Sequence, residues 1–212
     1  ALIIGDFSNG NDGIVMKGGS KVTDLKGREL KLVELSVSHY LLARALDQSG
    51  MTERDLSLVN TSDSDIAAVF ASDPKGAAGT WNPLLMQCRN LKGANLVFAS
   101  SKIPGEIIDL MVVRTNAPDK LKKALVGAWY ETMKLMSGKS KEAGQSIQYM
   151  AKFAGGTEAE FRAQLRTTHM FYDAAEAAQF AKSDQLKKTM EYVRTFSFDH
   201  GLYGQGAPSK DL

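Results

Sequence analysis

The sequence has very little cysteine and no long apolar run. Cys88 is the only cysteine among the 212 residues, which excludes a disulfide within the chain and any metal site built from several cysteines. No apolar stretch approaches the roughly 18 residues that a membrane-spanning helix needs. The net charge is only +2 and the two signs are interspersed, so nothing favours nucleic acid or an anionic membrane surface as a partner.

Patterns typical of catalysis are missing as well. The three histidines, His39, His169 and His200, have no spacing that suggests a metal site or a catalytic triad. No serine lies in a G-x-S-x-G turn, and no G-x-G-x-x-G or Walker pattern occurs. Cys88 lies in a predicted helix and is expected to be a buried small hydrophobe. We therefore expect no cofactor, no metal and no enzymatic activity.

What is present is the composition of an ordinary globular protein. Hydrophobic residues make up 43% and charged residues 24% of the chain. The length allows one large or two small domains with a sizeable core. The chain opens abruptly on the apolar run ALIIGDF, so we expect a mature or truncated chain, and the missing leader says nothing about its compartment.

The predicted fold is organised around residues 31–46. Alternating apolar residues at the start of this stretch indicate a buried strand, and apolar residues at helical spacing follow from Tyr40. Between them, Ser36 and Ser38 are good N-cap residues. A strand that turns directly into a helix presents unpaired backbone N–H groups, at the place where ligands bind in open α/β sheets. The two serines could equally serve only as helix caps.

The same order of strand, polar cap and helix recurs downstream. We expect a strand over 56–59, the polar segment 60–65 and a helix to about Ala71. Further strands are expected over 77–81, 96–99 and 107–114, and a further helix over 84–90. This alternation across residues 28–114 predicts α/β layers around a largely parallel sheet.

Both ends of the chain differ from this middle part. Near the start, strands over 2–4 and 14–17 are expected to flank a loop, 5–13, rich in glycine and in side chains that form hydrogen bonds. After Pro118 the pattern becomes helical. Helices are expected over 120–136, 140–154, 158–166, 173–181 and 183–199, with a short apolar link over 169–172 and a polar tail over 201–212.

Several segments, in this order, resemble the nitrate/sulfonate/taurine class of ABC-transporter solute-binding proteins. They are residues 25–27, 36–46 (SVSHYLLARAL), 50–56, 59–60 and 80–83 (TWNP). Residues 6–12, 104–110 and 196–201 are most similar to a branch encoded beside urea carboxylase. The resemblance covers essentially the whole chain, but chains of that family have a further segment corresponding to residues before Ala1.

The resemblance implies an α/β, periplasmic-binding-protein-like fold of type II, with two lobes and a solute in the cleft between them. Residues 1–17 would end the first half of lobe I and contain a hinge strand, and residues 18–107 would form lobe II. Residues 108–212 would supply the second hinge strand and the C-terminal helices of lobe I. Because lobe I would be partial, we expect self-association or a missing N-terminal fragment to cover its apolar surface.

Candidate ligand-binding residues lie where the predicted strands end. Ser36, Ser38 and His39 lie at a helix start, where N–H groups and the helix dipole favour a ligand oxygen. Trp81 could stack on a planar or cationic group, or be an ordinary core residue. Asp109 lies in an apolar strand and is expected to be buried, either contacting the ligand or paired with an arginine such as Arg114 or Arg44. The full set is Asp6, Asn9, Asn11, Asp12, Ser36, Ser38, His39, Asn60, Thr61, Asp63, Trp81, Glu106 and Asp109.

The resemblance implies a function in transport. The chain would be the solute-binding component of an ABC importer, in the periplasm or lipid-anchored outside the cytoplasmic membrane. Its partners would be a small solute and the membrane permease. Near the strand ends, acidic residues outnumber Lys and Arg, which favours a urea-, guanidine- or amide-like solute, while a taurine- or sulfonate-like solute is the other possibility.

Two other functions stay open at this point. One is an enzyme on the same fold, similar to the thiamine-pyrimidine synthases, which would need a histidine and clustered cysteines at the cleft. The other is the ligand-sensing domain of a transcription regulator, which would need a helix-turn-helix segment.

Overall fold

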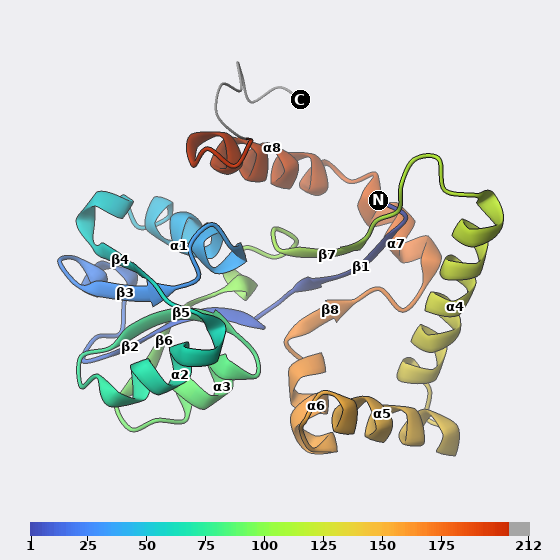
Figure 1. The fold of residues 1–212 in the computed structure, drawn as a ribbon, viewed down its shortest axis with the longest axis horizontal. Coiled ribbons are helices and arrows are strands. Elements are labelled where there is room, and N and C mark those ends of the chain that lie inside the picture. The colour runs from blue at the N-terminus through green and yellow to red at the C-terminus, as the bar shows by residue number, and fades with distance from the viewer. Residues whose placement is uncertain (204–212) are drawn as a thin grey trace. The chain divides into compact units, whose positions relative to one another are not determined.

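The computed structural model describes residues 1–203, which form two compact units (Figure 1). Unit 1 consists of residues 1–8 and 105–187, and unit 2 of residues 9–104 and 188–203. Most of the predicted polar tail, residues 204–212, lies outside the described residues. The predicted domain ranges stay a prediction. The two units differ from them at residues 9–17 and 188–203, which belong to unit 2, and at residues 105–107, which belong to unit 1.

Unit 2 is built on a five-stranded sheet with the strand order β4-β3-β5-β2-β6. The strands are β2 (Asp12–Lys17), β3 (Glu29–Leu32), β4 (Ser57–Asn60), β5 (Ala77–Trp81) and β6 (Ala94–Ala99). Strand β3 is parallel to β4 and β5, whereas β2 is antiparallel to both β5 and β6. Strands β3, β4, β5 and β6 thus all run in the same direction, in agreement with the predicted largely parallel sheet, and β2 is the exception. The alternation of strands and helices predicts parallel pairing only where a helix connects neighbouring strands, and β2 enters the sheet from outside that pattern.

Helices cover the sheet of unit 2 on both faces (Figure 1). Helix α2 (Asp63–Ser72) and helix α3 (Leu84–Arg89) enclose a core that contains Phe70 and the buried Cys88, as predicted. Helix α1 (Val37–Asp47) covers the opposite face with its apolar side. Ser36 caps α1: its Oγ accepts a hydrogen bond from the Ser38 N–H at 3.1 Å, which confirms the predicted helix start.

Three short 3-10 helices and the last helix complete unit 2. The 3-10 helices are η1 (Val22–Leu25), η2 (Glu53–Asp55) and η3 (Ser100–Lys102). Helix α8 (Asp184–Asp199) packs on α1: the Phe196 ring meets the Tyr40 ring edge-on at 5.5 Å, and the Arg44 guanidinium lies 4.0 Å from the Tyr192 ring. These ring contacts explain why the end of the chain belongs to unit 2.

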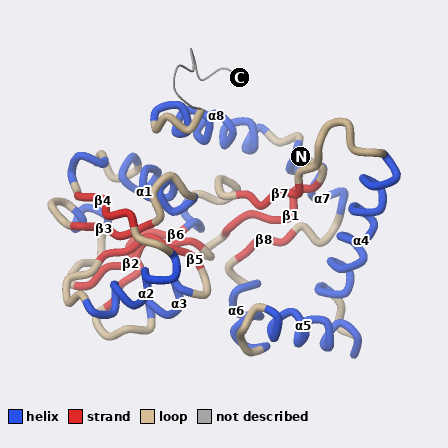
Figure 2. Tube along the Cα trace, viewed as in Figure 1, coloured by secondary structure: helices blue, strands red, loops and turns tan. Residues whose placement is uncertain are grey.

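Unit 1 combines a small antiparallel sheet with four helices, which Figure 2 distinguishes from the strands by colour. The sheet has the order β7-β1-β8, with β1 (Ile3–Ser8), β7 (Ile108–Met111) and β8 (Thr168–Met170). The helices are α4 (Asp119–Ser137), α5 (Lys141–Phe153), α6 (Glu158–Leu165) and α7 (Ala174–Ala181). Among the residues that the structure describes, no helix combines the length and the apolar character needed to cross a membrane.

Two short segments of the sequence were predicted incorrectly. Strand β1 continues through Ser8 and β2 begins at Asp12, so the expected loop over residues 5–13 is only residues 9–11. The expected link over 169–172 overlaps strand β8, whose backbone pairs with β1. In both places, pairing with a strand distant in sequence satisfies the backbone groups, and local residue preferences do not record such pairing.

Candidate functional site

The candidate site lies at one edge of the five-stranded sheet in unit 2. Because β3, β4 and β5 are parallel, their carboxyl ends meet at this edge. The start of β2 and the end of β6 lie there too, since Asp12 pairs with Trp81 and Gly13 pairs with Ala99. Ligands in open α/β sheets bind outside the carboxyl ends of the strands. Of the predicted residues, the edge and its loops bring together Asn9, Asn11, Asp12, Ser36, Ser38, His39, Asn60, Thr61, Asp63 and Trp81.

The start of α1 contributes a polar group without a partner. The Ser36 hydroxyl forms both of its hydrogen bonds within the chain: it accepts from Ser38 N–H, and it donates to the Val33 carbonyl at 2.6 Å. This is the helix-cap role that the sequence left open. Ser38 differs: its side chain is fully buried and its Oγ has no hydrogen-bond partner among the described residues. A buried hydroxyl without a partner is unfavourable unless a ligand or water completes its bonding.

The start of α2 differs from the start of α1 because it carries acidic side chains. No acidic residue lies in the first turn of α1, whereas the first turn of α2 contains Asp63 and Asp65. Burial raises the pKa of the Asp63 carboxyl, and its Oδ1 is a second buried atom at this edge without a partner in the described chain. Asn60 and Thr61 have structural roles: the Asn60 side-chain oxygen accepts from Glu34 N–H at 3.0 Å, and the Thr61 hydroxyl donates to Val59 O at 3.0 Å.

The end of β5 adds a third such atom. Thr80 is fully buried, and its Oγ1 has no partner among the described residues. The neighbouring Trp81 is half-buried. On the adjoining loop, the Ser100 Oγ accepts a hydrogen bond from Gly10 N–H at 2.7 Å and so fixes the short turn over residues 9–11. Thr80 and Ser100 were not predicted as site residues. Thr80 pairs with Gly13, and Ser100 follows Ala99, the other partner of Gly13, so it is the sheet that brings them together.

Three predicted residues lie in unit 1 instead. Asp6 and Asp109 are opposite each other across β1 and β7, and Glu106 precedes β7. The expectation that Asp109 is buried is wrong: β7 is an edge strand of a three-stranded sheet, and the Asp109 side chain is exposed. Its carboxylate therefore needs no internal partner. Arg44, one of the two partners considered for it, forms an ion pair with Asp47 at 2.7 Å.

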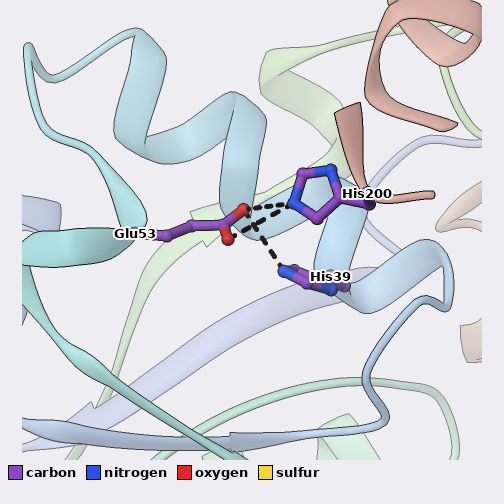
Figure 3. Close-up of side chains that lie close together, drawn as sticks. All are labelled: His39, Glu53 and His200. Carbon is purple, nitrogen blue, oxygen red and sulfur yellow. Dashed lines mark hydrogen bonds and ion pairs between the residues drawn. The ribbon is translucent and has the colours of Figure 1, made fainter. Parts of the chain in front are cut away.

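The His39 side chain forms a group with Glu53 and His200 in unit 2 (Figure 3). Its Nδ1 accepts a hydrogen bond from Leu35 N–H at 3.1 Å, and its Nε2 lies 3.2 Å from Glu53 Oε1. His200 Nε2 lies 3.0 Å from the same carboxylate oxygen. Sequence spacing suggested no such grouping, because Glu53 and His200 are 147 positions apart.

The polar edge presents two kinds of polar group that would suit a small molecule. The uncharged start of α1, with the Ser38 hydroxyl, suits an oxygen atom of a ligand. The Asp63 carboxylate at the start of α2 suits an N–H group. At the third position the hydroxyl of Thr80 can donate or accept.

Comparisons with known proteins agree with this architecture. Residues 13–117 match the family model described as NMT1/THI5 like. Over 72 residues the chain is 33% identical to a Brucella abortus protein named as a binding protein, and this segment is 34% of this chain and 23% of that protein. The match thus spans only about a quarter of the relative's length.

Solved structures with the same fold cover nearly all of the chain. The alkanesulfonate-binding protein SsuA from Xanthomonas axonopodis, bound to MOPS, matches with a TM-score of 0.68 and 19% identity, over 98% of this chain and 70% of that one. The periplasmic aliphatic sulphonate binding protein SsuA from Escherichia coli matches with a TM-score of 0.70 and 20% identity, over 93% and 64%. The desulfurization enzyme DSZB matches with a TM-score of 0.58 and 15% identity, over 91% of this chain and 72% of that one. The predicted α/β, two-lobed fold of periplasmic solute-binding proteins is therefore confirmed.

Proposed function

We propose that this chain is the solute-binding component of an ABC importer, a member of the NMT1/THI5-like proteins, and that it holds a small solute at the polar edge of unit 2. Among the described residues, six buried side-chain atoms have no hydrogen-bond partner, and the proposal rests on three of them: Ser38 Oγ, Asp63 Oδ1 and Thr80 Oγ1. All three belong to elements that meet at the edge where α/β sheets bind ligands. The similarity to sulfonate-binding proteins and to a Brucella binding protein supports the same function.

The solute that suits this edge carries both an oxygen acceptor and an N–H donor. A urea- or amide-like molecule has both groups, and so does an aminosulfonate such as taurine. Guanidinium lacks the oxygen, and nitrate or a simple alkanesulfonate lacks the N–H. The edge pairs an uncharged helix start with a carboxylate. It therefore favours urea-like, amide-like and aminosulfonate solutes over guanidinium, nitrate and simple alkanesulfonates.

The proposed partners and location follow from the same class of protein. A solute-binding component delivers its solute to a membrane permease, so we propose a periplasmic or lipid-anchored protein outside the cytoplasmic membrane. The branch encoded beside urea carboxylase remains the proposed subgroup. Self-association, or a further N-terminal segment of the protein, remains the proposed cover for apolar surface of unit 1.

Calorimetric titration of the chain with urea, acetamide, taurine, ethanesulfonate, guanidinium and nitrate tests the proposal. We expect measurable binding of at least one solute that has both groups. Ser38→Ala should weaken that binding by about tenfold or more, since a hydrogen bond in a buried site is lost. Asp63→Asn should weaken the binding of taurine more than the binding of ethanesulfonate, because only taurine has an N–H group.

Asp65→Asn is the matched control for Asp63→Asn. Asp65 lies in the same first turn of α2, but it is exposed and its carboxylate accepts from the Ser62 hydroxyl at 2.6 Å. Its replacement should leave solute binding unchanged. Equal weakening by both aspartate variants, or tight binding of nitrate alone, would contradict the proposed solute class. Absence of binding for the whole panel would count against the transport function itself.

An enzymatic function on the same fold is less well supported, although DSZB shares the fold. The thiamine-pyrimidine synthase alternative needs reactive cysteines at the site. Cys88, the chain's single cysteine, lies in the core between α2 and α3, and burial raises the pKa of its thiol. A buried thiol with a raised pKa is a poor nucleophile.

A further inference from the structure

Two imidazoles and one carboxylate converge in unit 2 from three separate elements (Figure 3). His39 comes from the first turn of α1, Glu53 from η2 and His200 from the residues that follow α8. Each side chain offers one ligand atom, and the three atoms all lie within 4.8 Å of one another. Neither the helix caps nor the polar edge described above accounts for this arrangement.

The His200 ring is held in the orientation that metal-bound histidines adopt. Its Nδ1 lies 2.9 Å from the Phe196 carbonyl oxygen, which can only accept, so Nδ1 carries the proton. Its Nε2 therefore faces the Glu53 carboxylate, 3.0 Å from Oε1 and 3.3 Å from Oε2. A hydrogen bond from Nδ1 to a backbone carbonyl is the usual way of fixing a ligating Nε2.

His39 supplies a buried nitrogen whose bonding is incomplete. Its side chain is only 5% exposed, and its Nε2 lies 3.2 Å from Glu53 Oε1. The two atoms are at ion-pair distance but not in hydrogen-bond alignment, and Nε2 has no hydrogen-bond partner among the described residues. Because Nδ1 accepts from Leu35 N–H, Nε2 carries the ring proton, and a cation held jointly with Glu53 and His200 would take the place of that proton.

We propose that His39, Glu53 and His200 form a binding site for a divalent transition-metal ion, with Zn²⁺ as the ion that fits best. Two imidazoles and one carboxylate are a common zinc ligand set, leaving one position for water. Donors about 2.0–2.1 Å from a shared tetrahedral ion are about 3.3 Å apart, close to the 3.0 and 3.2 Å measured here. The imidazoles disfavour Mg²⁺ and Ca²⁺, which prefer oxygen ligands.

Access to the site and the change that binding requires are both visible in unit 2. His200 and Glu53 are partly exposed, and His200 also lines a surface pocket between α1 and α8, so an ion can enter from solvent. Coordination through Nε2 moves the proton of His39 to Nδ1, so Nδ1 can no longer accept from Leu35 N–H. Zn²⁺ binding would therefore give up this hydrogen bond.

The bound ion would join the end of α8 to α1 and η2. Because the folded chain assembles the three ligands and the unfolded chain does not, Zn²⁺ should stabilise unit 2 by mass action. This inference does not depend on the proposed transport function.

Titration of the chain with zinc chloride, followed by calorimetry in a non-chelating buffer, tests the site. We expect one ion per chain and a higher unfolding temperature with Zn²⁺ but not with Mg²⁺. Glu53→Gln and His200→Gln should each weaken Zn²⁺ binding by about 100-fold or more. Far-UV circular dichroism checks that both variants fold. Bound Co²⁺ should give the strong visible absorption of a tetrahedral site.

Two further variants separate a metal site from a purely structural contact. Glu53→His should retain Zn²⁺ binding, because three imidazoles also form a zinc site, whereas a simple imidazole–carboxylate contact would be destroyed. His169→Gln is the matched control, since His169 and Glu176 form a two-residue pair at 3.2 Å in unit 1, with no third ligand among the residues that the structure describes. No Zn²⁺ binding by the unaltered chain, or unchanged affinity in both Glu53→Gln and His200→Gln, would refute the proposal. Loss of binding in His169→Gln would do so too.

Discussion

The two units differ most in how they bury apolar side chains. In unit 2 the strands β2 and β3 are buried along most of their length, because helices cover both faces of the sheet. In unit 1 the long helix α4 buries only Met133, and Leu121 and Leu135 on the same helix are exposed. Unit 2 thus holds most of the chain's core, and it also holds the polar edge and the proposed metal site.

This difference in packing indicates which unit can support a binding site. The polar edge consists of strand ends and helix starts, whose positions are fixed by a core that packs on both sides of a sheet. Buried atoms such as Ser38 Oγ can stay without a partner in the chain only when the surrounding packing is favourable enough to offset their unfavourable burial. The amphipathic helices and small sheet of unit 1 offer less of that support.

The largest expected effect comes from removing the same side chain in each unit. Phe70→Ala in unit 2 should lower the free energy of unfolding by about 3–5 kcal/mol, because Phe70 is fully buried in the core. Phe153→Ala in unit 1 should change it by no more than about 0.5 kcal/mol, because Phe153 is 86% exposed.

The two tryptophans allow this test to be read separately for each unit. Trp81 lies in unit 2 and Trp129 in unit 1, so Trp129→Phe leaves a fluorophore that reports on unit 2 alone. Urea unfolding followed by Trp81 fluorescence should show the loss for Phe70→Ala. If Phe153→Ala lowered the stability of unit 2 equally, the comparison between the units would fail.

An intermediate effect is expected from the helix caps. Ser36 caps α1 in unit 2, and Thr157 caps α6 in unit 1 by accepting from Glu160 N–H at 3.2 Å. Ser36→Ala and Thr157→Ala should each cost about 1 kcal/mol of stability. Only Ser36→Ala should also weaken solute binding, since it loosens the start of α1 beside Ser38. Solute titrations that are equally weakened by Thr157→Ala would show that the site is not confined to unit 2.

The smallest expected effect is on the pH dependence of stability, and it should be similar in the two units. Each unit has a capping box in which an acid accepts from a backbone N–H: Asp55 from Thr52, and Glu160 from Thr157. These hydrogen bonds lower the pKa of both carboxyls. A lowered folded-state pKa gives stability that is present above the unfolded-state pKa, about 4, and is lost as the pH falls through the folded-state value.

Asp55→Asn and Glu160→Gln should therefore lower the unfolding temperature slightly at pH 7 and leave it nearly unchanged at pH 3. Thermal unfolding between pH 3 and pH 7, read by circular dichroism, measures the change in slope. A larger loss at pH 3 than at pH 7 in either variant would reverse the sign and contradict the assignment.

Local patterns determined most elements of this protein. The spacing of apolar residues located the helices, and Ser36 was identified as the residue before the start of α1 because a cap is a short-range interaction. The burial of Cys88 also followed from its position in an apolar helix. Residues at strand ends were identified as site candidates because a polar residue directly after an apolar run can be recognised from the sequence alone.

Only the tertiary structure decided which of these candidates come together. The antiparallel entry of β2 placed Thr80 and Ser100 beside the predicted residues, and it added one antiparallel strand to the parallel set. The edge position of β7 left Asp109 exposed, although its apolar neighbours in sequence suggest burial. Packing of α8 on α1 brought His200 to Glu53 and His39. Each of these outcomes depends on contacts between residues far apart in the chain, and local residue preferences carry no record of such contacts.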